Sequence, residues 1–267
     1  MKRLLDRLVM LSAIMFAGLL CCGQNTAAQG QDTKEDRTSI FERARKAAEQ
    51  GDTEAQCKLG DVYRDGRDTT QDYAEAAKWF QKAAEKGLAD AQCKLGKLYQ
   101  TGQGVPQDYA EAVRWFRKAA EQGNAEAQCK LGAAYYTGQG VPLGYSESTK
   151  WYRKAAEQGH VEAQYNLGLA YYDRHHYTES IKWFRRAAEQ EEAKAQYNLG
   201  LAYENGQGIP QNCIEAYKWF SLATTTAGES DMFEARNRVT GHMTPEQIAE
   251  GDKRIAAFVA KKQEKKE

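Results

Sequence analysis

The sequence has no excess of charge of either sign and little proline. Its 37 Lys and Arg residues balance 37 Asp and Glu residues, and only 4 of its 267 residues are Pro. This balance gives no support for nucleic acid or acidic ligands as partners. With 42% hydrophobic and 28% charged positions, the chain has enough apolar residues to bury a core, which excludes a wholly disordered or low-complexity protein.

Long apolar runs are also absent after the N-terminus. No later segment approaches about eighteen uninterrupted apolar residues, so we expect no transmembrane segment in the mature chain. At the N-terminus, Lys2 and Arg3 precede a mostly apolar run over 8–20, which is too short to span a bilayer. We therefore predict a signal peptide over 1–28, cleaved after Ala28 or, as a second choice, after Gly23. The protein is then exported, either periplasmic or secreted.

Two cysteines next to this run raise the alternative of a lipid anchor. Cleavage before a lipidated Cys21 or Cys22 needs small residues ahead of the cysteine, but Leu20 occupies that region. The sequence therefore favours removal of both cysteines with the signal peptide, and leaves a lipoprotein as the alternative.

The rest of the chain is repetitive. A Leu-Gly pair recurs with spacings of 36, 36, 36 and 32 residues, at Leu59, Leu95, Leu131, Leu167 and Leu199. Every tryptophan of the chain also recurs at one position of the unit, at Trp79, Trp115, Trp151, Trp183 and Trp219. A period of this length corresponds to one helical hairpin.

Each unit contains two amphipathic patterns. In the first unit, Ala55, Leu59 and Val62 lie on one face of a helix, and Gly60 allows another helix to approach closely. A second helix is predicted to begin at Asp72 as N-cap and to end at Gly87. The links at 102–106, 138–142 and 206–210 share the pattern Gly-x-Gly-x-Pro, which is typical of a turn between antiparallel helices. The predicted fold is all-α, a right-handed α/α solenoid of five helical hairpins with helical caps.

The stretches Ala127-Gln128-Cys129-Lys130-Leu131-Gly132 and Trp115-Phe116-Arg117-Lys118-Ala119-Ala120-Glu121-Gln122-Gly123 carry a family resemblance. They resemble the Sel-1-like repeat family, the α/α solenoid relatives of tetratricopeptide repeats. The resemblance predicts five repeats within 52–227, at 52–87, 88–123, 124–159, 160–191 and 192–227. Repeat four departs from the pattern, because Asp173-Arg174-His175-His176 replaces the Gly-x-Gly-x-Pro link and four residues are missing. Its hairpin is expected to be tighter, nearer tetratricopeptide length.

Segments on both sides of the repeats are predicted to cap the array. Residues 29–51 contain a match to the second helix alone, and 228–267 contain a C-terminal capping helix followed by a charged tail over 261–267. Thr244 suits the N-cap of this helix, with Pro245 in its first turn and Gln247 closing a capping box.

The cysteines of the repeats are predicted to be small buried hydrophobes. Cys57, Cys93 and Cys129 occupy the same repeat position, and equivalent helices in stacked repeats lie about 8–10 Å apart or more. Disulfides need Cα atoms within about 7 Å, so pairing along the stack is unfavourable. Cys213 occupies the position that Tyr73 and Tyr109 fill in other units.

Some cysteine-rich relatives in this family are described as binding or hydrolysing β-lactams, so a cell-envelope hydrolase or β-lactam-binding protein is one alternative. The sequence contains neither Ser-x-x-Lys nor Lys-Thr-Gly, and its four histidines lack the spacing of a zinc site. His175 and His176, with Asp173, are better explained as an exposed turn than as a weak metal site. We predict no catalytic, cofactor-binding or metal-binding residue. A second alternative is an envelope component that acts by forming a homo-oligomer.

The main functional prediction is a scaffold or adaptor that binds a protein or peptide partner. In tetratricopeptide-like solenoids, the polar side of each first helix lines the concave groove. The candidate groove residues begin as a lysine row and end in asparagines and leucines, at Lys58, Asp61, Lys94, Lys97, Lys130, Asn166, Leu169, Asn198 and Leu201. Such a row suits an extended peptide, held through backbone amides and apolar anchors. Alternatively, the acid and lysine residues pair at i,i+4 and only stabilise their own helices.

Overall fold

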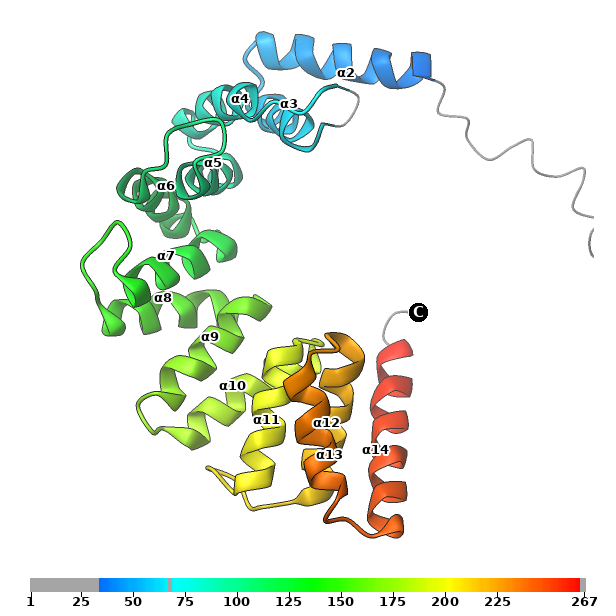
Figure 1. The fold of residues 1–267 in the computed structure, drawn as a ribbon. Helices are drawn as coiled ribbons and strands as arrows, with labels where there is room; N and C mark the ends of the chain where they lie inside the picture. The colour runs from blue at the N-terminus through cyan, green and yellow to red at the C-terminus, as the bar shows by residue number, and fades with distance from the viewer. Residues whose placement is uncertain (1–33, 67–68, 265–267) are drawn as a thin grey trace, which may run out of the picture.

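The chain forms an arc of stacked helical hairpins (Figure 1). The structure is a computed structural model that describes residues 34–66 and 69–264. Helices are the regular elements of this part, and no strand occurs in it. Their bounds are α2 (Lys34–Glu49), α3 (Thr53–Asp65), α4 (Tyr73–Glu85), α5 (Ala89–Thr101), α6 (Tyr109–Glu121), α7 (Ala125–Thr137), α8 (Tyr145–Glu157), α9 (Val161–Tyr172), α10 (Tyr177–Glu189), α11 (Ala193–Asn205), α12 (Cys213–Thr226), α13 (Ser230–Thr240) and α14 (Pro245–Gln263).

Five hairpins make up the body of the arc, and each consists of a first helix and a second helix. In the upper part of the arc, the first helices α3 and α5 face the inner side and the second helices α4 and α6 face the outer side (Figure 1). From α2 to α12, each helix packs mainly against its neighbours in the chain, while α13 and α14 both pack against α12. The predicted α/α solenoid is therefore confirmed.

The local signals predicted from the sequence set the ends of the helices. Asp72 accepts hydrogen bonds from the backbone N–H groups of Ala74 and Glu75, which makes it the N-cap of α4. Gly66 ends α3 in the left-handed conformation, with φ of 67°, and Gly102 ends α5 in the same way, with φ of 72°. In repeat four only residues 173–176 separate α9 from α10, so the expected tight hairpin is confirmed.

A glycine in each first helix lets an aromatic ring of the second helix lie against the backbone. A Cβ atom added at Gly96 would lie 2.7 Å from Cε1 of Phe116, a distance that real Cβ atoms do not reach. The same contact occurs in every repeat, as Gly60 with Phe80, Gly96 with Phe116, Gly132 with Tyr152, Gly168 with Phe184 and Gly200 with Phe220. The repeated Leu-Gly pair thus marks the closest approach within each hairpin.

A buried glutamine joins each first helix to the preceding repeat. The Nε2 group of Gln128 donates to the carbonyl of Ala120 at 3.0 Å, and its Oε1 atom accepts from Gln158 at 2.8 Å. Donation to a carbonyl eight residues earlier is common to Gln56, Gln92, Gln128, Gln164 and Gln196. These side chains satisfy carbonyls at the ends of the preceding helices, which would otherwise be buried without a partner.

Both ends of the array are closed by helices. At the N-terminal end, α2 supplies the carbonyl of Ala48 to Gln56. At the C-terminal end, Thr244 and Gln247 form the predicted capping box at the start of α14. Helix α13 was not predicted from the sequence, and the tail predicted from residue 261 is wrong in its first part, because α14 continues to Gln263. A reason for this continuation is that Phe258 packs against Trp219, which holds the last turns of α14 on α12.

The signal peptide predicted over 1–28 lies outside the described residues, as do Cys21 and Cys22. Among the helices of the described part, none has the length and apolar content needed to cross a membrane.

Candidate functional site

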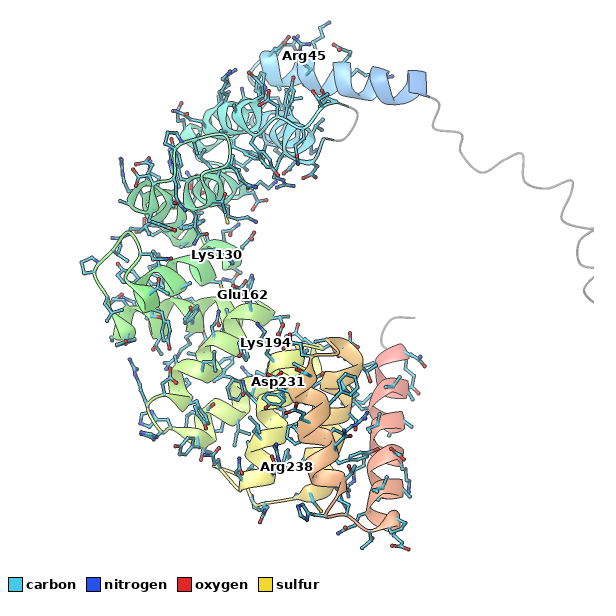
Figure 2. All side chains as sticks on the ribbon, in the orientation of Figure 1. Arg45, Lys130, Glu162, Lys194, Asp231 and Arg238 are labelled. Atoms are coloured by element: carbon cyan, nitrogen blue, oxygen red, sulfur yellow. The ribbon has the colours of Figure 1, made fainter. Side chains whose placement is uncertain are left out.

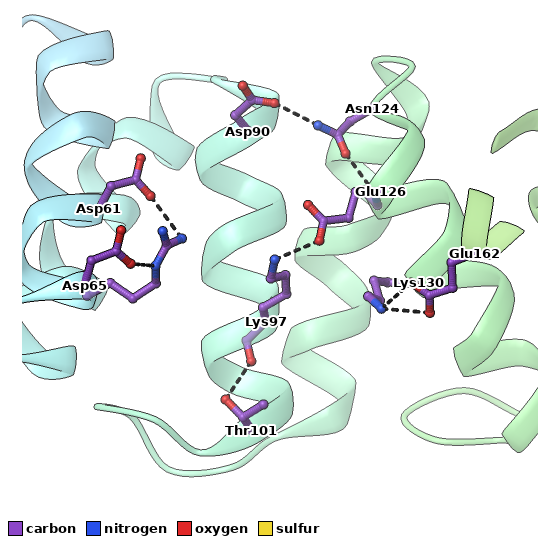
Figure 3. Close-up of polar contacts among 11 residues, drawn as sticks. Asp61, Asp65, Asp90, Lys97, Thr101, Asn124, Glu126, Lys130 and Glu162 are labelled. Atoms are coloured by element: carbon purple, nitrogen blue, oxygen red, sulfur yellow. Dashed lines mark hydrogen bonds and ion pairs between the residues drawn. The ribbon is translucent and has the colours of Figure 1, made fainter. Parts of the chain in front are cut away.

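Charged and polar side chains connect consecutive first helices across the inner face of the arc (Figure 3). Lys94 on α5 donates to Asp61 on α3 at 2.6 Å, and Lys97 on α5 donates to Glu126 on α7 at 2.7 Å. Two further contacts complete a set that we call the concave ladder, Asn124 to Asp90 at 2.8 Å and Lys130 to Glu162 at 3.1 Å. Lys130 and Glu162 lie at the concave edge (Figure 2).

The i,i+4 pairing considered from the sequence is wrong for these residues. Asp90 accepts from Asn124 and Lys94 donates to Asp61, so neither bonds to the other within α5. Likewise, Lys130 reaches Glu162 on the next first helix, while Glu126 is held by Lys97 on the previous one. The stacking of the repeats brings these partners together, so the pairs link neighbouring repeats and hold the spacing of the inner face.

Contacts within the ladder favour the charged forms of Glu126 and Lys130. Burial alone favours the neutral form of Glu126, but the hydrogen bond and charge of Lys97 outweigh it and lower the pKa of the carboxyl group. Burial similarly opposes the charged form of Lys130, yet Glu162 raises the pKa of its ammonium group. Partly exposed pairs of this kind contribute under about 1 kcal/mol each, so the ladder orders the surface more than it stabilises the fold.

The candidate groove residues fall into three groups. Lys58 is exposed, and its side chain makes no ion pair or hydrogen bond with any residue that the structure describes. Asp61, Lys94, Lys97 and Lys130 are members of the concave ladder.

The third group lies further along the arc and is half-buried. Asn166 and Asn198 are half-buried, and their amide groups interact with the Cys129 thiol and the Tyr165 hydroxyl. Leu169 and Leu201 are also half-buried, because both pack partly against the hydrophobic core of the last repeats. Each of the four residues therefore remains partly exposed on this half of the groove.

The structure also places the cysteines. Cys57, Cys93, Cys129 and Cys213 are all free thiols, and the first three are buried as predicted. Burial raises the pKa of the Cys93 and Cys129 thiols to about 12. The prediction for Cys213 is wrong, because its side chain is only half-buried and lines a pocket at the start of α12.

Thiol labelling should distinguish these sites. At pH 8, N-ethylmaleimide should modify Cys213 of the folded protein before Cys93 or Cys129, because the latter two are buried and un-ionised. In denaturant all three should react. Peptide mass spectrometry locates the label, and equal rates at Cys93 and Cys213 in the folded protein would contradict the assignment.

The same burial predicts a dependence of stability on pH. The pKa of the Cys93 and Cys129 thiols is higher in the folded protein than in the unfolded chain, where it is near 9.0. Both the folded and the unfolded protein therefore hold the thiol proton at neutral pH. As the pH rises from about 9 towards 12, unfolded thiols ionise while folded ones do not, and their contribution to the free energy of unfolding is lost.

Two pockets at the turn edge of the solenoid escaped the sequence analysis. The first encloses about 270 Å³ and is lined by Tyr136, Tyr145, Thr149, Ala170, Asp173 and Arg174. The second encloses about 420 Å³ and is lined by Glu204, Gln211, Cys213, Val239 and His242. The first pocket lies at the start of α8, and the hairpin that follows has a short turn at 173–176. The second lies at the start of α12, and the hairpin that follows has a short turn at 241–244. The shortened turn of repeat four was the signal in the sequence that could have located the first pocket.

The described residues contain no candidate metal site. In the part of the chain that the structure describes, no three His, Cys, Asp or Glu side chains are grouped in a way that could hold a metal ion. The turn that contains His175 and His176 is exposed, and the ring of His175 contacts the hydroxyl of Tyr177 at 2.8 Å.

Comparison with known proteins matches the repeats directly. The model of the Sel1 repeat matches residues 53–88, 89–124, 125–160 and 193–225. The chain belongs to the Sel1 repeat family. Within this Sel1 repeat protein, residues 161–192 match the tetratricopeptide repeat instead, in agreement with the shorter fourth hairpin.

Several solved structures are similar to this chain. A Sel1 repeat protein from Oxalobacter formigenes is 30% identical to this chain, with a TM-score of 0.64, and the match covers 73% of this chain and 84% of that one. A putative Sel1 repeat protein from Klebsiella pneumoniae subsp. pneumoniae is 24% identical, with a TM-score of 0.49 and coverage of 75% and 99%. Cysteine rich protein B of Helicobacter pylori is 22% identical, with a TM-score of 0.40 and coverage of 51% and 97%. A comparison with curated proteins finds no match.

Sel1 and tetratricopeptide repeats are generally non-enzymatic scaffolds for protein interactions. The candidate surfaces for such an interaction are the concave face and the turn edge.

Proposed function

We propose that this Sel1 repeat protein is an exported scaffold that binds an extended peptide segment of a partner protein on its concave face. The observation that carries the proposal is the concave ladder, which fixes the first helices side by side before any partner arrives. A surface that is already ordered loses less entropy on binding than one that must be arranged.

The chemistry of the face supports a polar, backbone-directed mode of binding. All three ladder lysines are paired with carboxylates of neighbouring repeats, whereas Lys58 on α3 forms no ion pair with any residue that the structure describes. Asn166 and Asn198 follow on α9 and α11, and each carboxamide can both donate to and accept from a peptide backbone. The exposed Lys194 lies on the same edge (Figure 2).

The proposal is tested by crosslinked pulldown from the native envelope fraction, comparing two variants of equal chemical change. Lys58→Glu/Asn166→Ala alters the concave face without breaking the ladder. Lys182→Glu/Gln81→Ala makes the same kinds of change on the outer helices α10 and α4, where the Lys182 side chain is 67% exposed. We expect the concave variant to lose the partner at least about tenfold, and the outer variant to retain it.

Circular dichroism of both variants first establishes that helical content is unchanged. A partner that is lost only in the outer variant would contradict the proposal, and so would recovery of the protein from the cytoplasm alone.

A further inference from the structure

The pocket beside repeat four lies where the other repeats place part of their own chain. In the regular repeats, the Gly-x-Gly-x-Pro turn folds back over the start of the preceding second helix. A Cβ atom added at Gly104 would lie 2.2 Å from the backbone carbonyl of Tyr73, and one added at Gly140 would lie 2.1 Å from the carbonyl oxygen of Tyr109. Only a residue without a side chain permits this approach, so the turn rests on the helix backbone.

The residue after this glycine is aliphatic and packs beside the helix. Val105 packs against the core cluster that contains Ala77, and Val141 packs against the cluster that contains Val113. Gly140 and Val141 also share the lining of one hollow with Ala110 and Val113. Ile209 packs in the same way against the cluster of the fourth repeat.

The start of α8 has no such cover, because the next turn is short. Tyr145 and Thr149 on α8 correspond in the repeat to Tyr109 and Val113 on α6. Tyr145 is 51% exposed, and both residues line the 270 Å³ pocket. The turn over 173–176 contains neither the glycine nor the aliphatic residue that occupies the matching place elsewhere.

We propose that this pocket, at Tyr145, Thr149 and Ala170, binds a peptide segment of a partner protein with the sequence Gly-Val-Pro or Gly-Ile-Pro. The pocket lies near the lower end of the size range of ligand sites, roughly 300–1,000 Å³, which suits one or two side chains of a peptide. The occupant reproduces the contact that the protein makes with its own turns in the other repeats.

Two observations narrow the choice of occupant. The protein's own Val105, Val141 and Ile209 are already half-buried in their own repeats, so a second copy would have to release one of them to fill the pocket. At the rim, Arg174 forms no ion pair with any residue that the structure describes, so its charge is available to a carboxylate that follows the proline.

The test is an NMR titration of the full chain, labelled with ¹⁵N, with a capped peptide of the sequence Gly-Gln-Gly-Val-Pro-Gln-Asp, which copies residues 102–108. We expect shifts centred on Tyr145, Thr149 and Ala170. A control peptide with serine in place of valine should bind about tenfold more weakly, because it lacks the aliphatic group.

A second variant supplies the occupant within the chain. Replacement of residues 174–176 by Gly-Gln-Gly-Val-Pro-Gln-Asp adds the four missing residues and restores the turn, and should abolish the peptide-induced shifts. Tyr145→Ser is a simpler variant at an exposed position, and should weaken the peptide several-fold without loss of helical content. The proposal is overturned by an absence of shifts at roughly millimolar peptide, by equal binding of the two peptides, or by shifts centred elsewhere.

Discussion

Replacement of Phe116 by alanine is expected to lower the free energy of unfolding by about 3–5 kcal/mol. The ring is 1% exposed and packs in a cluster with Ala112, Val113 and Leu131. Truncation removes its buried apolar surface and leaves a cavity that the surrounding helices can fill only in part. Urea denaturation followed by circular dichroism measures the change.

Phe233→Ala provides the matched control. This phenylalanine is 39% exposed on α13, so the same chemical change should cost far less there, within about 1 kcal/mol. If the two variants were destabilised equally, the ring of Phe116 could not be a buried contact between α5 and α6.

Gly96→Ala is expected to destabilise the protein by about 1–3 kcal/mol, although alanine favours a helix more than glycine does. The added methyl group would lie 2.7 Å from Cε1 and 2.8 Å from Cδ1 of Phe116, and 3.1 Å from the carbonyl oxygen of Ala112. The ring is enclosed and cannot move aside, so α5 and α6 must separate.

The two substitutions should therefore be coupled. In a Phe116→Ala background the extra methyl group of Gly96→Ala points into the cavity, so the double variant should be more stable than the sum of the single changes predicts, by about 0.5–3 kcal/mol. Strict additivity in this double-mutant cycle would show that the glycine and the ring do not touch.

The helices of the repeats were predictable because local and periodic signals agree there. Asp72 caps α4, Gly66 and Gly102 end their helices with positive φ, and the Leu-Gly pair marks the contact between the helices of a hairpin. Helix α13 was missed because it lies beyond the last match to the repeat, and its N-cap residue, Glu229, makes no side-chain cap.

The pattern of contacts on the concave face was not predictable in the same way. Lys97 and Glu126 are 29 residues apart, and only the rotation and rise between stacked hairpins bring the two side chains within 2.7 Å. A helical wheel places each residue on a face of its own helix, but it contains no information about the neighbouring helix. The same limitation explains why the partial burial of Leu169 and Leu201 against the core was not predicted.

The pocket at Tyr145 and Thr149 was only partly predictable from the sequence. The sequence shows that four residues are missing from repeat four, but the role of the turn elsewhere becomes visible only in the contact between Gly104 and the backbone of Tyr73. Once that contact is known, the missing residues in the turn at 173–176 show that the start of α8 is left uncovered.

The buried glutamines also have an evolutionary consequence. Every junction between repeats uses the same donor, an amide that reaches a carbonyl eight residues earlier, at Gln56, Gln92, Gln128, Gln164 and Gln196. Since all junctions are interchangeable in this respect, recombination within the gene can duplicate or delete a whole unit and still produce a compatible junction. The length of the inner surface, and hence the length of partner it can accommodate, can then change by copy number without any change in the residues of the interface.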